Sequence, residues 1–172
     1  YKRQNERLEA RCSLVYADEE ILKLVKFYSP KVVSVDAPLA LPKGRCCLRD
    51  DCICRNKGHL RECDKILLKI GIKFFPVTLG PMRKLTLRGL RLKPLIERMG
   101  FKVIETYPGA AQDLLGFPRK SKGIDSLRNA LIRWGVKGEL LKKELTDHEL
   151  DAVTCALVGK MYWENNYIGL GD

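Results

Sequence analysis

Three acidic residues from distant parts of the sequence are the first candidates for chemistry. Asp36 ends a Val-rich run over residues 31–37, and Glu105 stands near the end of a second apolar run over residues 101–106. If both runs are strands of one parallel sheet, their carboxyl ends lie at the same edge, where such sheets build their sites. Asp151 falls in the first turns of a helical pattern, at the border of its apolar face. We expect the three carboxylates to converge at this edge and to bind Mg²⁺ or Mn²⁺ through hard oxygen ligands.

Each of these carboxylates also has an ordinary structural interpretation. Asp36 precedes Ala-Pro and could organise a turn, and Glu105 could pair with a lysine. Asp147, at the start of the last helical pattern, could complement the helix dipole. The metal-site hypothesis therefore depends on the joint arrangement and not on any one residue.

The chain carries an excess of positive charge. Its 172 residues include 32 Lys and Arg against 21 Asp and Glu, a net charge of +11 at pH 7. A surplus of this size attracts polyanions and favours nucleic acid over acidic partners. Arg83, Thr86 and Arg88 lie near the start of an expected helix, where amides and arginines suit phosphate oxygens. We predict that these residues hold the backbone of a nucleic acid, and the alternative is a solvated basic face.

Five of the seven cysteines lie in an irregular, basic stretch over residues 42–63, which we interpret as an insertion. The thiols are sufficient for a closed tetrahedral Zn²⁺ site, although their spacing differs from that of paired CxxC knuckles. The ligands expected for this structural zinc are Cys47, Cys52, Cys54 and Cys63. Reduced thiols without a metal are the alternative, and disulfides are less favoured than either.

Cysteine usage and hydropathy also bear on location. The sequence contains neither a signal peptide nor an apolar run of the ~18 to 20 residues that a transmembrane helix requires. An odd number of cysteines without a secretion signal indicates a reducing compartment. We therefore expect a cytoplasmic protein with no membrane partner.

Apolar runs typical of strands alternate with segments of helical periodicity. This alternation predicts an α/β layer fold with a largely parallel sheet. No internal repeat or linker-like run divides the chain, so we expect one domain over residues 1–172. The last helix is the best defined, because Thr146 and Glu149 form a capping box at its start. Other helices are expected at about 18–28, 60–70, 85–99, 110–115 and 121–134, with a loop over 74–82 and a further strand over 9–16.

Five segments of the sequence resemble one protein family, the domain of unknown function 429 family of predicted nucleases. The resemblance is carried by the strings VDAPLALP, RECDKILL, GPMRKLTLRG, VIETYPGAAQDLLGFPRK and TDHELDAVTCALVG, and it runs from about Lys31 to Asp172. It implies an RNase H-like fold, in which helices flank a mixed sheet, and a carboxylate site for two metal ions. The family's site residues fall on Asp36, Glu105 and Asp151.

One feature of the RNase H-like superfamily is missing from this sequence. Members begin with a hairpin whose first strand carries an essential Asp, whereas Asp18 lies at an expected helix start. We interpret residues 1–16 as the tail of that hairpin and expect the leading strand, with its Asp, to precede Tyr1. The alternative is that this protein lacks a full metal site.

The leading functional hypothesis is a divalent-metal-dependent nuclease that hydrolyses phosphodiester bonds of DNA, RNA or a hybrid. The alternative is a non-catalytic nucleic-acid-binding module that keeps the basic face and a structural metal in the cysteine-rich loop. A third hypothesis is a phosphotransferase with the related actin-like layout, which the lack of a Gly-rich phosphate loop disfavours.

Overall fold

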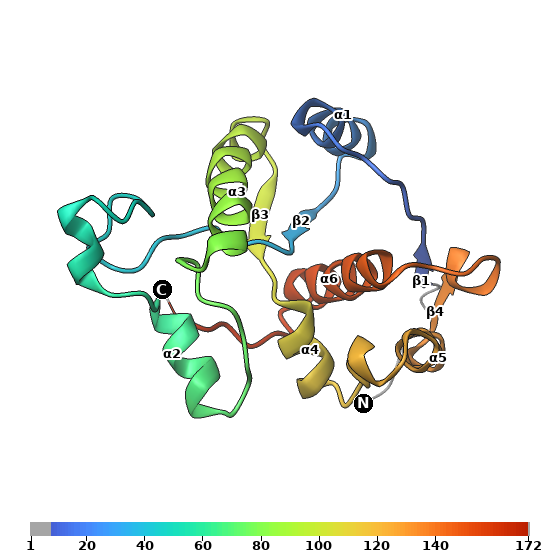
Figure 1. Cartoon of the computed structure of the whole chain (residues 1–172). Coiled ribbons are helices and arrows are strands. Elements are labelled where there is room, and N and C mark those ends of the chain that lie inside the picture. The colour runs from blue at the N-terminus through green and yellow to red at the C-terminus, as the bar shows by residue number, and fades with distance from the viewer. Residues whose placement is uncertain (1–7, 172) are drawn as a thin grey trace.

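The computed structural model describes residues 8–171. Helices and short strands alternate along this part of the chain, so the α/β class predicted from the sequence is confirmed (Figure 1). The strands are β1 (Leu8–Ala10), β2 (Val32–Val35), β3 (Lys102–Glu105) and β4 (Val136–Gly138). The helices are α1 (Asp18–Tyr28), α2 (Glu62–Lys69), α3 (Gly80–Arg98), α4 (Pro108–Leu114), α5 (Ile124–Trp134) and α6 (Asp147–Trp163).

The described strands form two small parallel sheets, β2 with β3 and β1 with β4, and not the single larger sheet that we expected. Helix α6 packs against both pairs: its residues Leu150 and Val153 share a core with Val136 of β4, and its C-terminal half lies on β2. In the first pair Val35 lies opposite Glu105, so Asp36 follows β2 at the edge where β3 ends. The expected common edge is therefore formed by one pair of strands.

The strand expected over residues 9–16 is shorter in the structure. β1 ends at Ala10, and its described partner is β4. Leu8 and Ala10 contact the core cluster of α5 and α6, whereas Leu14 and Tyr16 are exposed and have no apolar layer to pack against. The part of the predicted hairpin over residues 1–7 lies outside the described residues.

The β2–β3 pair is covered on both faces. Val33 and Val35 contact the core cluster that contains Leu92 of α3. Ser34 faces α6, because a Cβ placed on Gly159 of that helix would lie 3.2 Å from the Ser34 Cβ. Since successive strand residues point to opposite faces, α3 and α6 lie on opposite sides of this pair.

Two glycines allow the helices to approach β2 and the segment that follows it. Gly159 brings α6 against β2, and Asp151 lies about two turns earlier on the same helix. On the other side, a Cβ on Gly89 of α3 would lie only 2.6 Å from the carbonyl oxygen of Pro38. Glycine at position 89 therefore lets α3 hold the Asp36–Pro38 segment in place.

The capping box predicted for the last helix is confirmed at the start of α6. The backbone N–H of Glu149 donates to the Thr146 hydroxyl (3.2 Å), and the Glu149 carboxylate accepts from the Thr146 N–H (2.8 Å). This cap fixes where the helix begins. Asp147 and Asp151 consequently stand one turn apart on the same side of α6.

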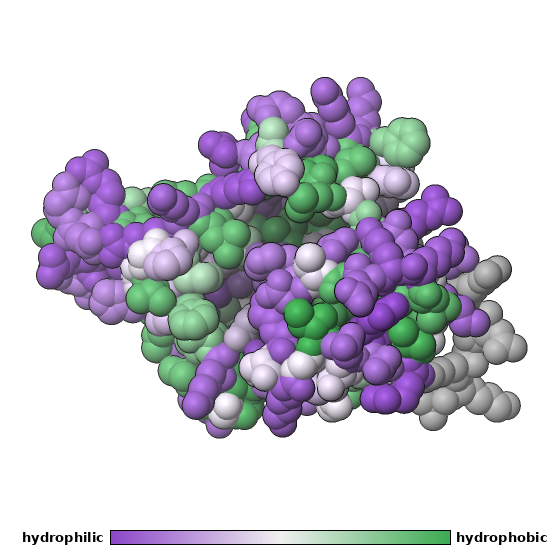
Figure 2. Space-filling model, turned by 45° about the vertical axis from the view of Figure 1, so that its right-hand side comes forward, coloured by the Kyte–Doolittle hydropathy of each residue, from purple (hydrophilic) through white to green (hydrophobic). Residues whose placement is uncertain are grey.

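The cysteine-rich insertion projects from the rest of the protein as a lobe beside α3 (Figure 1). Its surface is mostly hydrophilic, as Figure 2 shows at the left of the molecule. A 3₁₀ turn over Ile53–Lys57 provides its regular structure. Leu48 and Cys54 are its buried apolar side chains between residues 43 and 57, so the lobe has very little core of its own.

Candidate functional site

Asp36 and Asp151 come together although they are far apart in the sequence. Asp36 follows β2, and Asp151 belongs to α6, which packs on that strand. Loss of water around the carboxyl group and the negative charge of Asp151 together raise the pKa of Asp36 to about 6. Asp36 is nevertheless exposed on one side, so an ion from solvent can reach it. Two neighbouring carboxylates, one of them exposed, offer the oxygen ligands that a divalent cation prefers.

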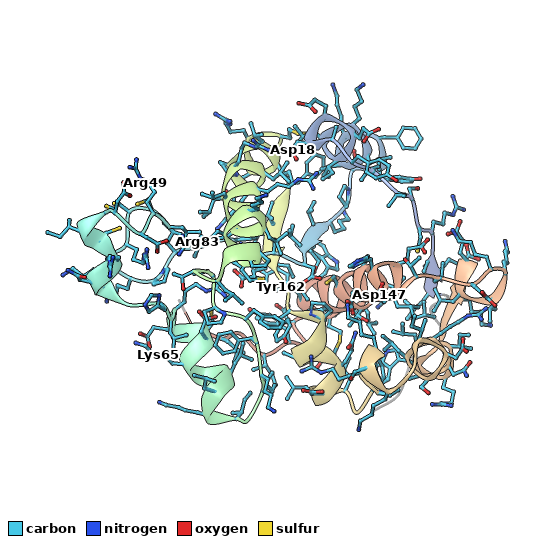
Figure 3. The ribbon with its side chains drawn as sticks, viewed as in Figure 1. Asp18, Arg49, Lys65, Arg83, Asp147 and Tyr162 are labelled. Carbon is cyan, nitrogen blue, oxygen red and sulfur yellow. The ribbon has the colours of Figure 1, made fainter. Side chains whose placement is uncertain are left out.

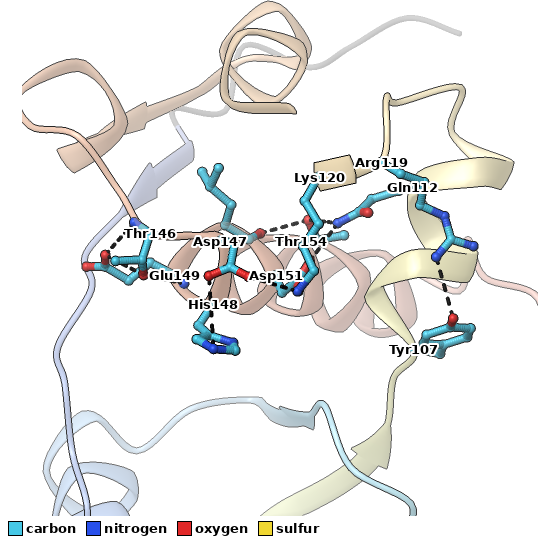
Figure 4. Close-up of polar contacts among 11 residues, drawn as sticks. Tyr107, Gln112, Arg119, Lys120, Thr146, Asp147, His148, Glu149, Asp151 and Thr154 are labelled. Atoms are coloured by element: carbon cyan, nitrogen blue, oxygen red, sulfur yellow. Dashed lines mark hydrogen bonds and ion pairs between the residues drawn. The ribbon is translucent and has the colours of Figure 1, made fainter. Parts of the chain in front are cut away.

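Lys120 places a positive charge between the carboxylates of α6. Its ammonium lies 2.9 Å from Asp151 Oδ2 and 3.1 Å from Asp147 Oδ2 (Figure 4). The bond to Asp151 raises the pKa of Lys120, and Lys120 in turn lowers the pKa of Asp147. Lys120 therefore neutralises the charge that a bound cation would neutralise.

Asp151 is buried and has a partner on each oxygen. Its Oδ2 accepts from Lys120, and its Oδ1 accepts from the buried Gln112 side-chain amide at 2.9 Å. The same Gln112 amide lies 3.4 Å from the Thr154 hydroxyl. These bonds fix the orientation of the Asp151 carboxylate.

His148 lies at the solvent side of this acidic group. Its Nε2 is 4.0 Å from Asp147 Oδ1, and its side chain is almost fully exposed (Figure 4). Electrostatic interaction with Lys120, and to a smaller extent with His148, lowers the pKa of Asp36, in the opposite direction to the effect of Asp151. His148 is thus an accessible imidazole beside the two carboxylates.

Glu105, the third expected ligand, is held by other partners. Its Oε2 accepts from the Leu39 backbone N–H (2.7 Å) and from Arg61 Nη1 (2.8 Å). Within residues 8–171, the carboxylates of Asp36, Glu105 and Asp151 do not form a group whose ligand atoms all lie within 4.8 Å. Of the three expected ligands, Asp36 and Asp151 therefore lie near each other, whereas Glu105 fixes the loop that follows Asp36.

Arg61 connects Glu105 to a second, buried carboxylate that sequence reasoning missed. Its Nη2 lies 2.9 Å from Asp64 Oδ1, and its Nε lies 3.1 Å from Asp64 Oδ2. Although burial favours the neutral form, the hydrogen bonds to Asp64 and the charge of Glu105 raise the pKa of Arg61. The spacing Arg-x-x-Asp at the start of a helix was the available signal, because Asp64 also accepts from the Arg61 N–H.

The three residues predicted to bind phosphate have partners within the protein. Both Arg83 Nη atoms lie 2.6 Å from the Asp50 carboxylate. Arg88 Nε lies 2.7 Å from Asp18 Oδ1. Thr86 is fully buried, and its hydroxyl donates to the carbonyl of the preceding helical turn. Arg83 and Arg88 remain partly exposed, whereas the buried Thr86 hydroxyl is not available to a substrate.

Four cysteines of the lobe gather at one point, and their identity corrects one expected ligand. The Sγ atoms of Cys46 and Cys52 are 3.7 Å apart, and those of Cys47 and Cys54 are 3.6 Å apart. All four lie within 4.8 Å of one another, so this group could hold a metal ion. Cys63 is elsewhere, in α2, with its Sγ near Asp64 Oδ1. Cys46 therefore replaces Cys63 in the set.

The four thiols influence one another because they are in contact. Against the effect of burial, hydrogen bonds from the backbone of Cys46 and from the Cys52 thiol lower the pKa of Cys54 to about 6. The cysteines of the described residues are free thiols. A group of this kind has a thiolate available for a soft metal ion.

No helix among the described residues is both long and apolar enough to cross a bilayer. Comparison with curated proteins and with solved structures finds no match to the chain. The model of one family, the proteins of unknown function designated DUF429, matches residues 5–171. Since this match covers nearly the whole chain, the protein belongs to the DUF429 family.

Proposed function

We propose that this protein is a divalent-metal-dependent nuclease that hydrolyses phosphodiester bonds at the site around Asp36 and Asp151. The observation that carries the proposal is the meeting of these two carboxylates at the end of β2, with a raised pKa on the accessible one. An RNase H-like arrangement is part of the proposal. It is supported by the parallel β2–β3 pair with α3 and α6 on its opposite faces.

The residues present suit Mg²⁺ or Mn²⁺. Two carboxylates supply hard oxygen ligands, and their mutual repulsion would be relieved by a cation. Lys120 already provides such a positive charge at Asp151, and its side chain is 42% exposed, so it can leave as an ion enters. Asp36 and Asp151 would hold the metal, which would supply Lewis-acid activation of a water molecule and of the phosphate.

The surrounding residues have separate tasks in this proposal. Gln112 keeps Asp151 oriented, and Glu105 fixes the loop after Asp36 through the Leu39 N–H. We therefore assign Glu105 to positioning. Lys120, once released from Asp151, can bind a substrate phosphate, and His148 presents an exposed imidazole at the same end of α6.

Nucleic acid is the proposed substrate because of the charge of the whole chain. A net charge of +11 attracts a polyanion over roughly a Debye length of 8–10 Å. Arg83 and Arg88 keep 31% and 38% of their side chains exposed while paired with aspartates. Both can therefore also face a phosphate backbone, whereas Thr86 is left out of the proposed interface.

The test is cleavage of labelled single-stranded, double-stranded, hybrid and branched substrates during a Mn²⁺ titration. We expect at least one substrate to be cut in the presence of Mn²⁺ and left intact in the presence of a chelator. Binding of the same substrates without metal-dependent cleavage would contradict the nuclease. That outcome would favour the non-catalytic binding module instead.

Replacing Lys120 with Met should tighten Mn²⁺ binding. The substitution removes the ammonium that competes with the cation at Asp147 and Asp151. Surface ion pairs are worth about 0.2–1 kcal/mol each, so loss of the two pairs should lower the dissociation constant by roughly two- to thirtyfold. Lys120 and Lys122 lie in one short 3₁₀ turn, Lys120–Lys122. Lys122→Met is therefore the control and should leave the constant within about twofold, because Lys122 is not paired with these carboxylates. Equal constants for all three proteins, measured by Mn²⁺ spin resonance, would contradict a cation site at Asp151.

A further inference from the structure

The four lobe cysteines form a compact cluster, and two of its sulfur pairs have the separation expected at a tetrahedral metal site. A tetrahedron with Zn–S bonds of about 2.3 Å has edges of about 3.8 Å. The two closest sulfur pairs are 3.6 and 3.7 Å apart, and all pairs lie within 4.8 Å. A disulfide would need about 2.05 Å. The four sulfur atoms are therefore too far apart for a disulfide and close enough together to surround one metal ion.

Apart from its hydrogen bonds, the lobe has few buried side chains to hold one conformation. Its turns are irregular, and large side chains such as Ile53 (85% exposed) point into solvent. A segment that cannot bury enough apolar surface usually depends on a crosslink or a metal for order. The hydrophilic surface of the lobe in Figure 2 agrees with this view.

We propose that Cys46, Cys47, Cys52 and Cys54 bind one structural Zn²⁺ ion. All four positions of a tetrahedral ion are then filled by protein, so the site is closed and has no place for a substrate. As each Zn–S bond forms, the thiol loses its proton to solvent, and no electrons are transferred. This proposal is independent of the nuclease chemistry at Asp36.

The ion would hold the lobe in the position at which it contacts α3. Figure 3 labels Arg83 on α3, on the side of the helix that faces the lobe. Asp50 lies in the loop between Cys47 and Cys52, and its carboxylate accepts hydrogen bonds from both Nη atoms of Arg83. Arg45, buried within the lobe, donates to the carbonyl oxygens of Cys47 and Gly58. A metal that fixes the cysteines therefore also fixes Asp50 opposite Arg83.

The experiment uses the full chain, purified without chelator, and measures metal by plasma mass spectrometry. We expect about one Zn²⁺ per chain, and an intense thiolate-to-metal charge-transfer band after exchange for Co²⁺. Cys52→Ser and Cys46→Ser should each reduce bound zinc at least tenfold after dialysis against a weak chelator. Cys63→Ser is the matched control, because Cys63 is a neighbouring cysteine that lies outside the cluster, and it should keep its zinc.

A second readout reports on the lobe itself. Trypsin should cut at the exposed Arg49, Arg55 and Lys57 in chelator-treated protein and spare them in the zinc-bound protein. Three outcomes would overturn the proposal. These are protein without zinc, equal loss of zinc in Cys63→Ser and Cys52→Ser, or a protein mass lowered by disulfide formation among the four cysteines.

Discussion

Replacing Arg61 with Met is expected to lower the free energy of unfolding by about 3–5 kcal/mol, because it leaves a buried carboxylate without its partner. The Arg61 side chain is 11% exposed, and that of Asp64 is 2% exposed. The guanidinium neutralises Asp64 through two hydrogen bonds and reaches Glu105 with its Nη1. A methionine keeps much of the volume of arginine and removes all of these bonds.

Lys65→Met is the matched control for this prediction. Lys65 lies in the same helix, α2, and pairs with Glu62 at 2.6 Å, but both side chains are more than half exposed. Exposed pairs of this kind contribute about 0–1 kcal/mol, so we expect a change below about 0.5 kcal/mol. Urea unfolding at pH 7.5 measures both variants. Equal losses would mean that water reaches Asp64 when Arg61 is removed.

Elements with strong local signals could be predicted from the sequence. The capping box at Thr146 and Glu149 lies within four residues, and α6 begins where it predicts. The two β-branched runs likewise form β2 and β3. The predicted start of α3, at about residue 85, was wrong: the helix begins at Gly80, whereas Gly80 and Pro81 were assigned to a loop. Proline is favourable in the first turn of a helix, where its missing N–H has no intrahelical partner.

The site could be predicted only where the fold class alone positions its residues. Asp36 and Asp151 meet because α6 packs on β2, which follows from an α/β layer fold. The ion pair between Glu105 and Arg61, 44 positions away, depends on the path of the insertion. The periodicity of the sequence does not predict that path. The same is true of the cysteines. The lobe folds back so that Cys46 is close to Cys52, and sequence spacing could not distinguish Cys46 from Cys63 as a ligand.

Asp36→Asn is expected to reduce cleavage strongly while making the protein more stable at neutral pH. The metal ligand is lost, and because ions of this kind supply several kcal/mol of transition-state stabilisation, we expect cleavage to fall at least about 100-fold. Stability changes in the opposite direction. The charged Asp36 is disfavoured in the folded protein by its surroundings and by Asp151, and asparagine carries no charge.

The sign and the pH window of the stability change follow from the raised pKa. Asp36 has a pKa of about 6 in the folded protein and 3.8 as its ordinary value, so between these pH values the folded state binds more protons than the unfolded state. Wild-type stability therefore falls as pH rises from about 4 to 6, relative to Asp36→Asn. The full shift corresponds to about 3 kcal/mol, and because Asp36 is open to water on one side we expect about 1–2 kcal/mol.

Urea unfolding of both proteins between pH 3.5 and 7.5, without divalent ions, measures this difference. The two curves should coincide near pH 3.5 and separate above pH 5, with the variant more stable. Asp51→Asn is the control. Arg49 lowers the pKa of Asp51, so the Asp51 carboxylate stabilises the folded protein and its removal should not raise the free energy of unfolding. Adding Mn²⁺ should raise the stability of wild type and not of Asp36→Asn, because bound cation offsets the repulsion from Asp151. A functional site predicts that the Asp36 carboxylate is kept although it lowers the stability of the protein. If Asp36→Asn were instead less stable than wild type at pH 7.5, Asp36 would be a structural residue.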